Sequence, residues 1–275
     1  MPTPARDPTA PPIADRLDVT LRLVRGGTAS LAELAARLGV SEMTVRRDLD
    51  VLQGKGLVQR IRGGAVAVGD VGAQSGFAAR QSWQADTKDR LARAAAALVA
   101  PGSTVLLDAG TTTVYVARHL VARHLVARAP LTVGVLSLHA AVCLADQPGI
   151  RLLIIGGECR PGERSLAGPL TARTLAELSF DLFIMSIGAV HAEAGWSEFT
   201  LEDAVVKQAA LAQAARTVVV ADATKLGVRA FARVAELAAV DALITDSSAQ
   251  DPHLSPAAQE TLAAIGRTDL EVTYA

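Results

Sequence analysis

Three turns, each placed directly after a short apolar run, collect groups that bind anions and sugar hydroxyls. The first, Asp108–Thr113, offers three hydroxyls and the free N–H groups of a following helix, which suit a phosphate. The second, Gly156-Gly157-Glu158, lets backbone approach a ligand while the carboxylate accepts from hydroxyls. The third ends at Lys225, whose ammonium could meet an anion. Each turn alone has a plainer explanation: threonines cap helices, glycine pairs follow many strands, and a lone lysine is usually solvated.

The elements around these turns predict where the turns lie. Helices and apolar strands alternate from Lys88 onward. We expect strands at Thr104–Leu107, Leu131–Leu136, Arg151–Ile155, Leu182–Ile187, Thr217–Ala221 and Ala242–Thr245. We expect helices at Leu91–Val99, Thr112–Arg128, His139–Ala145, Leu170–Leu178 and Glu202–Ala215. This alternation predicts a largely parallel sheet covered on both faces. The turns would then meet at the carboxyl edge of the sheet, where such folds bind ligands.

One helix of this series contains a tandem repeat. Val-Ala-Arg-His-Leu occupies 116–120 and again 121–125. Five residues advance a helix by about 500°, so the two copies cannot bury the same stripe. We interpret the repeat as a duplication that lengthens or bulges a surface helix. His119 and His124 are poorly spaced to share a metal ion.

A second group of residues suits nucleic acid. In a helix starting at Ser41, an apolar side formed by Val45, Leu49 and Leu52 turns inward. The outward residues are then Ser41, Thr44 and Arg47, flanked by Met43 and Arg46. Hydroxyls suit phosphate oxygens, and an arginine fork on guanine contributes roughly 1–3 kcal/mol of discrimination. We therefore predict that this helix reads DNA.

The surrounding pattern predicts a winged helix-turn-helix over residues 13–68. Helical spacing covers 13–25 and Leu31–Leu38, and Gly39 ends the second helix before the recognition helix begins. Two β-like runs, Leu57–Arg60 and Ala65–Val68, would form the hairpin. Arg60 and Arg62 on that hairpin could follow the DNA backbone or enter the minor groove. A three-helix oligomerisation domain with solvated arginines remains the alternative.

Composition is consistent with these two domains. Half of the residues are hydrophobic and 3% are aromatic, which describes an α/β protein with an aliphatic core. Residues 1–66 hold ten basic and seven acidic residues, a net charge of +3, so the total of −1 leaves −4 for residues 67–275. We expect 1–12 to be a disordered tail, 69–87 a linker and 88–275 an effector-sensing domain.

Several classes are excluded by what the chain lacks. Cys143 and Cys159 form no CxxC pattern, which argues against a disulfide framework or a zinc site. The first residues do not read as a signal peptide, and no run approaches the ~20 apolar residues of a membrane span. We expect a cytoplasmic protein with no metal, no cofactor and no membrane contact.

At the level of motifs, the head resembles the DeoR family of transcription regulators. The resemblance is carried by Leu31–Ser41, by Thr44-Val45-Arg46-Arg47-Asp48-Leu49, and by Gly56-Leu57 with Arg62-Gly63-Gly64-Ala65. Arg62 stands where the family usually has histidine, which keeps a hydrogen-bond donor. The resemblance implies a double-stranded DNA operator as partner.

The resemblance continues through the rest of the chain. It is carried by Phe77, Arg80 and Lys88, by Asp108–Thr113, Gly156–Glu158 and Gly168-Pro169, and by Asp203-Ala204, Lys207 and Asp222–Lys225. It implies a sensor domain similar in fold to ribose-5-phosphate isomerase and CoA-transferase-like proteins. It also implies a homo-oligomer and a phosphorylated sugar or similar effector that lowers operator affinity. The implied effector-binding residues are Arg80, Lys88, Asp108, Gly110, Thr111, Thr112, Thr113, Ser137, Gly156, Gly157, Glu158, Gly188, Lys207 and Lys225.

The chain departs from the family pattern in three places. Val135-Leu136-Ser137 stands where the family tends to have Thr-Asn-Ser, Gly188 replaces an acidic or polar residue, and the repeat follows the threonine turn. A regulator with an unusual effector or a decayed pocket therefore stays open.

A sugar-phosphate isomerase with a fused DNA-binding head is the alternative from another class. It would use Asp108, Glu158 and Lys225 as acid–base groups. The threonine turn suggests binding more than proton transfer, and no histidine or cysteine stands in a catalytic motif. We predict a repressor of carbohydrate-metabolism genes and not an enzyme.

Overall fold

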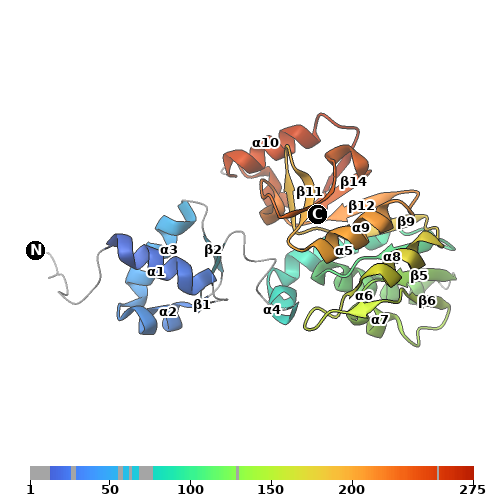
Figure 1. Cartoon of the computed structure of the whole chain (residues 1–275), viewed down its shortest axis with the longest axis horizontal. Helices are drawn as coiled ribbons and strands as arrows, with labels where there is room; N and C mark the ends of the chain where they lie inside the picture. The colour runs from blue at the N-terminus through green and yellow to red at the C-terminus, as the bar shows by residue number, and fades with distance from the viewer. Residues whose placement is uncertain are drawn as a thin grey trace, which may run out of the picture. The chain divides into compact units, whose positions relative to one another are not determined.

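The computed structural model divides the chain into two compact units, Met1–Ser75 and Gly76–Ala275 (Figure 1). The described residues are 13–25, 29–54, 58–61, 64–67, 77–127, 130–252 and 254–275. The predicted tail, 1–12, and the first part of the predicted linker lie outside them.

The first unit is a winged helix-turn-helix, as predicted. Its elements are α1 (Ile13–Arg25), β1 (Ala29–Ser30), α2 (Leu31–Leu38), α3 (Glu42–Gly54), β2 (Val58–Ile61) and β3 (Gly64–Ala67). The strands form an antiparallel sheet in the order β1-β3-β2, in which the two-residue β1 was not predicted. Leu34, Val45 and Leu49 pack in the centre of its core with almost no exposed surface.

Local signals fix the two helices that make the DNA-reading turn. Ser30 caps α2 and forms a reciprocal capping box with Glu33, so two otherwise unpaired N–H groups are satisfied. Gly39 ends the helix with a left-handed φ of 64°, which an L side chain adopts at a cost. The chain can therefore turn sharply into α3.

A buried ion pair joins α3 to α1. Arg16 donates two hydrogen bonds to Asp48, from Nε over 2.6 Å and from Nη2 over 2.8 Å. Asp48 is buried and 11% of the Arg16 side chain is exposed, and the contact with Asp48 raises the pKa of Arg16 above its ordinary value. The aspartate of the Arg-Arg-Asp-Leu motif thus sets the angle of the recognition helix rather than facing solvent.

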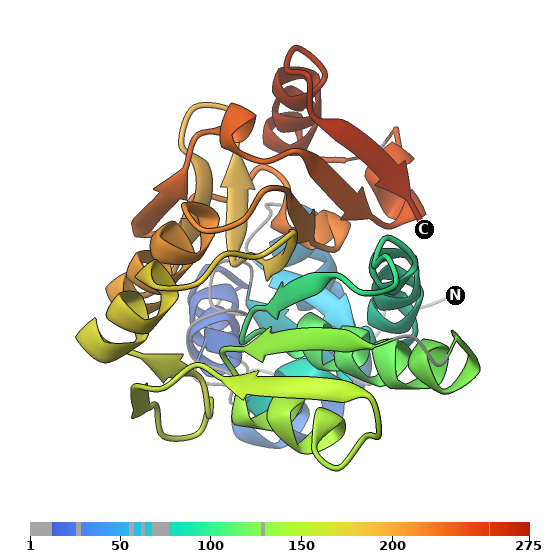
Figure 2. The same ribbon diagram turned by 90° about the vertical axis from the view of Figure 1, so that its right-hand side faces the viewer.

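The second unit is built on a seven-stranded parallel sheet with the order β15-β14-β12-β9-β4-β5-β6. Its strands are β4 (Thr104–Leu107), β5 (Leu131–Val135), β6 (Ile150–Ile154), β9 (Leu182–Ser186), β12 (Thr217–Val220), β14 (Ala242–Thr245) and β15 (Glu271–Tyr274). Figure 2 shows β4, β5 and β6 side by side, with their arrowheads at one edge. The prediction of a parallel sheet is confirmed.

Helices cover both faces because the central strands are apolar on both sides. One face packs against α5 (Ala85–Ala97), α6 (Thr111–Ala127) and α7 (Leu138–Leu144). The other face packs against α8 (Pro169–Ala176), α9 (Leu201–Leu211) and α10 (Pro256–Ile265), and against a small antiparallel sheet of β10 (Ala189–His191), β11 (Gly195–Glu198) and β13 (Ala232–Ala235). The hairpin of β7 (Glu158–Cys159) and β8 (Leu166–Ala167) follows β6.

The order of the strands defines where a ligand can bind. From β4 the chain first builds β5 and β6 on one side and then returns to place β9 on the other side. Such a reversal opens a crevice at the carboxyl ends of the two strands. The predicted turns after β4, β6 and β12 all lie along that edge.

The predicted linker, 69–87, is shorter in the structure than the sequence suggested. Residues 77–82 form α4 (Phe77–Ser82), and 85–87 are the first turn of α5. This stretch lacks helical periodicity because α4 is only six residues long and buries one large side chain, Phe77. Tertiary contacts rather than an amphipathic pattern hold it in place.

The tandem repeat lies within α6, which runs unbroken through both copies. Ala117 of the first copy is fully buried, whereas Ala122 at the same place in the second copy is exposed. His119 contacts Asp89 at 2.9 Å and His124 contacts the carbonyl of Pro148 at 2.5 Å. The copies present different faces, as the helical advance requires.

The Arg16–Asp48 pair yields a stability prediction for the head. Asp48→Asn should leave the guanidinium of Arg16 buried without its counter-charge, which costs about 3–5 kcal/mol. Thermal denaturation followed by circular dichroism should therefore show an early transition from the head. Asp50→Asn, which removes the exposed ion pair with Arg60, is the matched control and should cost about 1 kcal/mol or less. Equal effects of the two variants would contradict the assignment.

Candidate functional site

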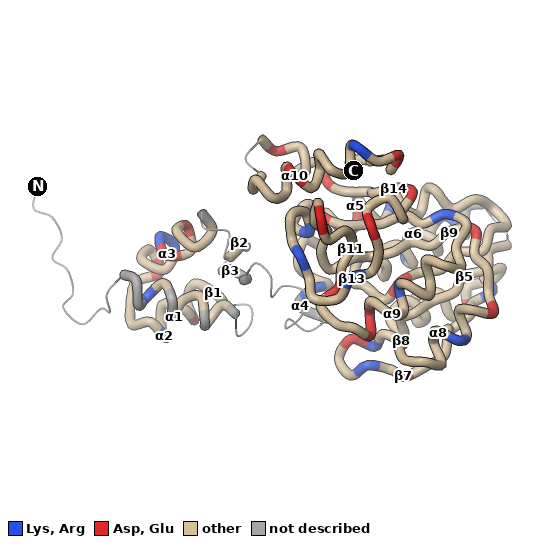
Figure 3. Tube along the Cα trace, turned by 45° about the horizontal axis from the view of Figure 1, so that its top comes forward, with Lys and Arg blue, Asp and Glu red and all other residues tan. Residues whose placement is uncertain are grey.

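The outer face of α3 presents the residues predicted to read DNA. Ser41, Arg46 and Arg47 are exposed, and 61% of the surface of Met43 is accessible. Figure 3 shows basic and acidic positions following one another along this helix. The opposite face of α3 packs in the core, where Val45, Leu49 and Leu52 are buried. The helix can therefore offer its outer side to a groove without losing packing.

The polar residues at the start of α3 are engaged with each other. The hydroxyls of Ser41 and Thr44 are 3.0 Å apart, and the amide of Thr44 donates to Ser41 Oγ at 3.3 Å. On the hairpin, Arg60 forms a 2.6 Å ion pair with Asp50 that is open to solvent. Arg62 lies outside the described residues.

A buried ionic network occupies the crevice between β4 and β9. Lys207 of α9 pairs with the carboxylate of Asp108, which also accepts from the hydroxyl of Ser186 and from its amide at 3.0 Å. Lys207 further donates to the carbonyl of Ser186 at 2.8 Å. A Cβ on Gly110 would overlap the Ser186 side chain, so only glycine lets the β4 turn approach β9 this closely.

Glu198 of β11 completes the network. Its carboxylate lies 3.2 Å from Lys207 Nζ and accepts from the amide of Gly188 at 2.9 Å. Burial raises the pKa of Glu198 against the opposing effect of Lys207. Burial lowers the pKa of Lys207, but the carboxylates of Asp108 and Glu198 outweigh it, so the net shift is upward. The lysine therefore stays charged inside the protein.

The threonine turn divides into two kinds of residue. Thr113 is fully buried, and its hydroxyl donates to the carbonyls of Asp108 and Gly110, each over 2.7 Å. Thr111 and Thr112 lie in the first turn of α6, where backbone N–H groups have no partner within the helix. Thr113 thus holds the turn from inside, while Thr111 and Thr112 begin the helix.

A cationic cluster is formed by Arg80, Lys88 and Lys225, and its two lysines lie over the Trp83 ring. The ammonium of Lys88 lies 5.6 Å from the centre of the Trp83 ring, and that of Lys225 lies 5.8 Å from it. Trp83 lies between α4, which carries Arg80, and α5, which carries Lys88, whereas Lys225 follows β12. Three positive charges from separate elements therefore meet at the carboxyl edge.

Lys88 has an unusual environment within this cluster. It is 3% exposed and donates to the backbone carbonyls of Arg80 and Trp83, the latter over 2.7 Å. Burial, with smaller contributions from Lys225 and Arg80, lowers its pKa to about 8 against the opposing effect of Asp222. Three cations face two neighbouring carboxylates, Asp222 and Glu163, which leaves a net charge of +1 that favours an anion.

The remaining predicted residues lie at the ends of β5, β6 and β9. Ser137 is fully buried and caps α7 by accepting from the amide of His139 at 3.1 Å. The α-carbon of Gly156 faces open space, whereas Gly157 is closed in by Thr171. Glu158 is exposed on β7, and Gly188 is closed in by Glu198 and Phe199.

Sequence reasoning missed Trp83, Ser186 and Glu198. Trp83 stood in the predicted linker, where its one signal was being one of two tryptophans in the chain. Ser186 meets Asp108 across 78 residues of sequence, and Glu198 has no motif that points to Lys207. These are long-range pairings that local patterns do not contain.

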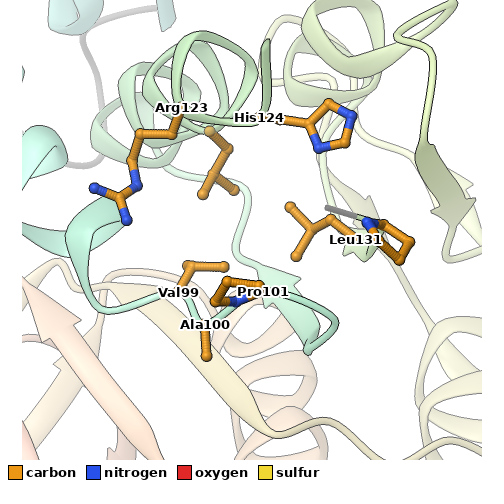
Figure 4. Close-up of a pocket in the computed structure, with 8 residues that line it drawn as sticks. Val99, Ala100, Pro101, Arg123, His124 and Leu131 are labelled. Carbon is orange, nitrogen blue, oxygen red and sulfur yellow. The ribbon is translucent and has the colours of Figure 1, made fainter. Parts of the chain in front are cut away.

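A small pocket lies at the opposite, amino edge of the sheet. It has a volume of about 50 Å³ and is lined by Val99, Ala100, Pro101, Leu120, Arg123, His124, Pro130 and Leu131. Figure 4 shows Arg123 and His124 extending from α6 towards it. Among the described residues there is no cluster of histidine, cysteine and carboxylate side chains suited to a metal ion. None of the described helices is long and apolar enough to cross a membrane.

Known proteins resemble both units. The family model described as the DeoR C terminal sensor domain matches residues 83–247, and the DeoR-like helix-turn-helix domain matches 19–70. The HTH-type transcriptional regulator GlpR of Haloferax volcanii is 32% identical, over 80% of this chain and 84% of its own. The HTH-type transcriptional repressor CsqR of Escherichia coli is 33% identical, over 84% and 87% respectively.

A third relative, the glycerol-3-phosphate regulon repressor of Escherichia coli, is 29% identical over 80% of this chain and 85% of its own. Among solved structures, ribose 5-phosphate isomerase A from Methanocaldococcus jannaschii aligns with 52% of this chain and 54% of its own, at 21% identity and a TM-score of 0.39. The two family models together with the curated relatives show that the chain belongs to the DeoR family of DNA-binding transcription regulators.

Proposed function

We propose that this regulator is a repressor whose hold on its operator is relieved by a phosphorylated sugar or a related anionic metabolite. The effector would bind at the carboxyl edge of the sensor sheet, with its anionic group against the cationic cluster. The chain would act in the cytoplasm as a homo-oligomer, since paired heads are what match paired half-sites on DNA.

The observation that carries this proposal is the meeting of Arg80 with Lys88 and Lys225, the two lysines that lie over Trp83. A phosphate dianion there would replace repulsion among the three cations by attraction. It would also lie at the sheet edge where α6 begins, and helix starts favour anions. The relative named for glycerol 3-phosphate is consistent with an effector of this class.

The predicted site residues fall into two groups by the contacts that their side chains make. We infer that Arg80, Lys88, Lys225, Thr111, Thr112, Gly156 and Glu158 face the effector. Buried Asp108, Thr113, Ser137 and Lys207 hold the turns in position, and the three glycines at 110, 157 and 188 allow them to approach one another.

Isomerase chemistry is disfavoured by the same geometry. Asp108 would be a proton carrier in that alternative, yet its carboxylate accepts from Lys207 and Ser186 inside the protein. Those contacts with Lys207 and Ser186 would have to break before the carboxylate could take a proton from a substrate. The relatives identified are transcription regulators, which agrees with a binding rather than a catalytic role.

On DNA, we infer that Arg47 reads a base edge and that Arg46 and the start of α3 meet phosphates. Operator fragments can be enriched from genomic DNA with the full-length protein. Arg47→Ala should then weaken binding to those fragments by about 1–3 kcal/mol in electrophoretic shift assays and relax the sequence preference. Arg233→Ala, on an exposed side chain of the sensor, is the control. Wild-type affinity in Arg47→Ala would disprove the assignment of the reading helix.

The cationic cluster predicts a charge-dependent effector site. Lys225→Gln should weaken binding of glycerol 3-phosphate by roughly ten-fold, since a charge-assisted contact contributes about 1.5–3 kcal/mol. Isothermal titration calorimetry on the full-length protein gives the dissociation constant. Arg267→Gln removes an exposed charge elsewhere in the same domain and should change nothing. If both variants bind like wild type, the anion lies elsewhere.

The lowered pKa of Lys88 predicts a pH dependence. The ammonium attracts the anion only while protonated, so affinity should be highest below about pH 8 and fall above it by up to ten-fold per pH unit. A phosphate ester is already a dianion above about pH 7, so the decline reports on the protein. Lys88→Arg keeps its charge and should flatten the profile. A flat wild-type curve from pH 7 to 10 would count against a role for Lys88.

A further inference from the structure

Helix α4 is the first described element after the head, and residues 68–76 join the end of β3 to its start. With six residues, α4 is far too short to be stable on its own in water. Its conformation therefore depends on the contacts that it makes with the rest of the sensor unit.

Those contacts come from four directions. The Phe77 ring stacks on His139 with ring centres 3.9 Å apart and planes 10° from parallel. Arg80 forms an ion pair with Glu163. The hydroxyl of Tyr115 donates to the carbonyl of Gln81 at 3.1 Å. Lys88 binds the last turn through the carbonyls of Arg80 and Trp83.

Glu163, the partner of Arg80, lies on the loop between β7 and β8. Arg160 on the same loop forms a 2.5 Å ion pair with Asp203 at the start of α9. The loop is thereby fixed at one end to α9 and at the other to α4. Glu163 is three-quarters buried, so its bond to Arg80 is shielded in part from solvent.

Two of the three cations in the proposed anion site are thus the groups that secure α4. A phosphate carries more charge than a carboxylate and matches the guanidinium fork of Arg80 equally well. It would also repel the carboxylate of Glu163. The ammonium of Lys88 has three donors, and turning them to the anion weakens its bonds to the end of α4.

We propose that α4 is a latch: an anion bound by Arg80 and Lys88 takes Arg80 from Glu163 and Lys88 from the end of α4, so that the helix unwinds while the Arg80 side chain stays on the anion. This inference rests on the proposed function, since it assigns the effector's signal to Glu163. His139, which Phe77 covers, has a buried Nε2 without a hydrogen-bond partner among the described residues. Burial lowers the pKa of His139, as does Arg164, so the stack is between neutral rings near pH 7.

Release of α4 would lengthen the connection to the head. With Arg80 held by the anion, residues 77–79 are the part that can extend, from about 5 Å as a helix to about 10 Å. Two heads on longer tethers have a lower effective concentration at paired half-sites, and the operator loses its bivalent grip. No contact between head and sensor is needed for this effect.

The test begins without any ligand. Glu163→Gln should speed amide hydrogen exchange in a peptide spanning 77–82 by about five-fold or more, because one shielded ion pair is lost. The same variant of the full-length protein should bind enriched operator fragments more weakly. Glu271→Gln breaks the Arg216–Glu271 pair at the amino edge of the sheet and is the matched control, with neither change expected.

A second arm adds glycerol 3-phosphate to the wild type, with its binding followed independently by calorimetry. Exchange in 77–82 should rise towards the Glu163→Gln value, and in that variant the ligand should bind more tightly but change exchange little. Unchanged exchange in Glu163→Gln overturns the latch. Ligand binding without faster exchange in the wild type also overturns it while leaving the effector site intact.

If calorimetry detects no binding of glycerol 3-phosphate or of other sugar phosphates, the proposed function fails first. The latch then loses its trigger and is rejected with it, even if Glu163→Gln loosens α4. The calorimetric arm therefore separates failure of the site from failure of the coupling.

Discussion

The buried pairing of Lys207 with Asp108 is the constraint on which the sensor depends. It joins the ends of β4 and β9 to α9 and, through Glu198, to the small sheet. Burying charges is costly unless each finds its partner, so these residues must all be present in one geometry. Because Asp108 and Glu198 are engaged there, the carboxylates that face the cationic cluster are Asp222 and Glu163. The cluster keeps a net positive charge, which supports the proposed anion site.

Much of this arrangement could be predicted from sequence, and for a definite reason. Strands buried on both faces read as apolar runs such as Val105–Leu107, and turns after parallel strands must share an edge. The fold of the head could also be predicted, since Gly39 and the apolar face of α3 are local signals. The partners of Asp108 were not, because Ser186 and Lys207 lie 78 and 99 residues away. Helix α4 has no periodic pattern, and its stability is entirely tertiary.

Some of the positive charge in the head is neutralised by ion pairs within it. Asp48 and Asp50 neutralise Arg16 and Arg60, so Arg46 and Arg47 carry much of the attraction that α3 can offer to DNA. Non-specific affinity for DNA grows with the number of phosphates neutralised. Among the described cations, Arg16 and Arg60 are therefore paired within the head, whereas the exposed Arg46 and Arg47 lie on the face of α3 that is proposed to meet DNA.

The second copy of the repeated pentapeptide lies near the end of α6, remote from the threonine turn at its start. Thr113 fixes the beginning of α6 to the turn that it follows, so extra residues later in the helix displace only what lies downstream. At the amino edge of the sheet, His124 of the second copy forms a hydrogen bond with the carbonyl of Pro148. The second copy, residues 121–125, therefore lies near the end of α6, away from the turn that Thr113 holds. A change of length at that end of the helix would leave the contacts of Thr113, and with them the start of α6, in place.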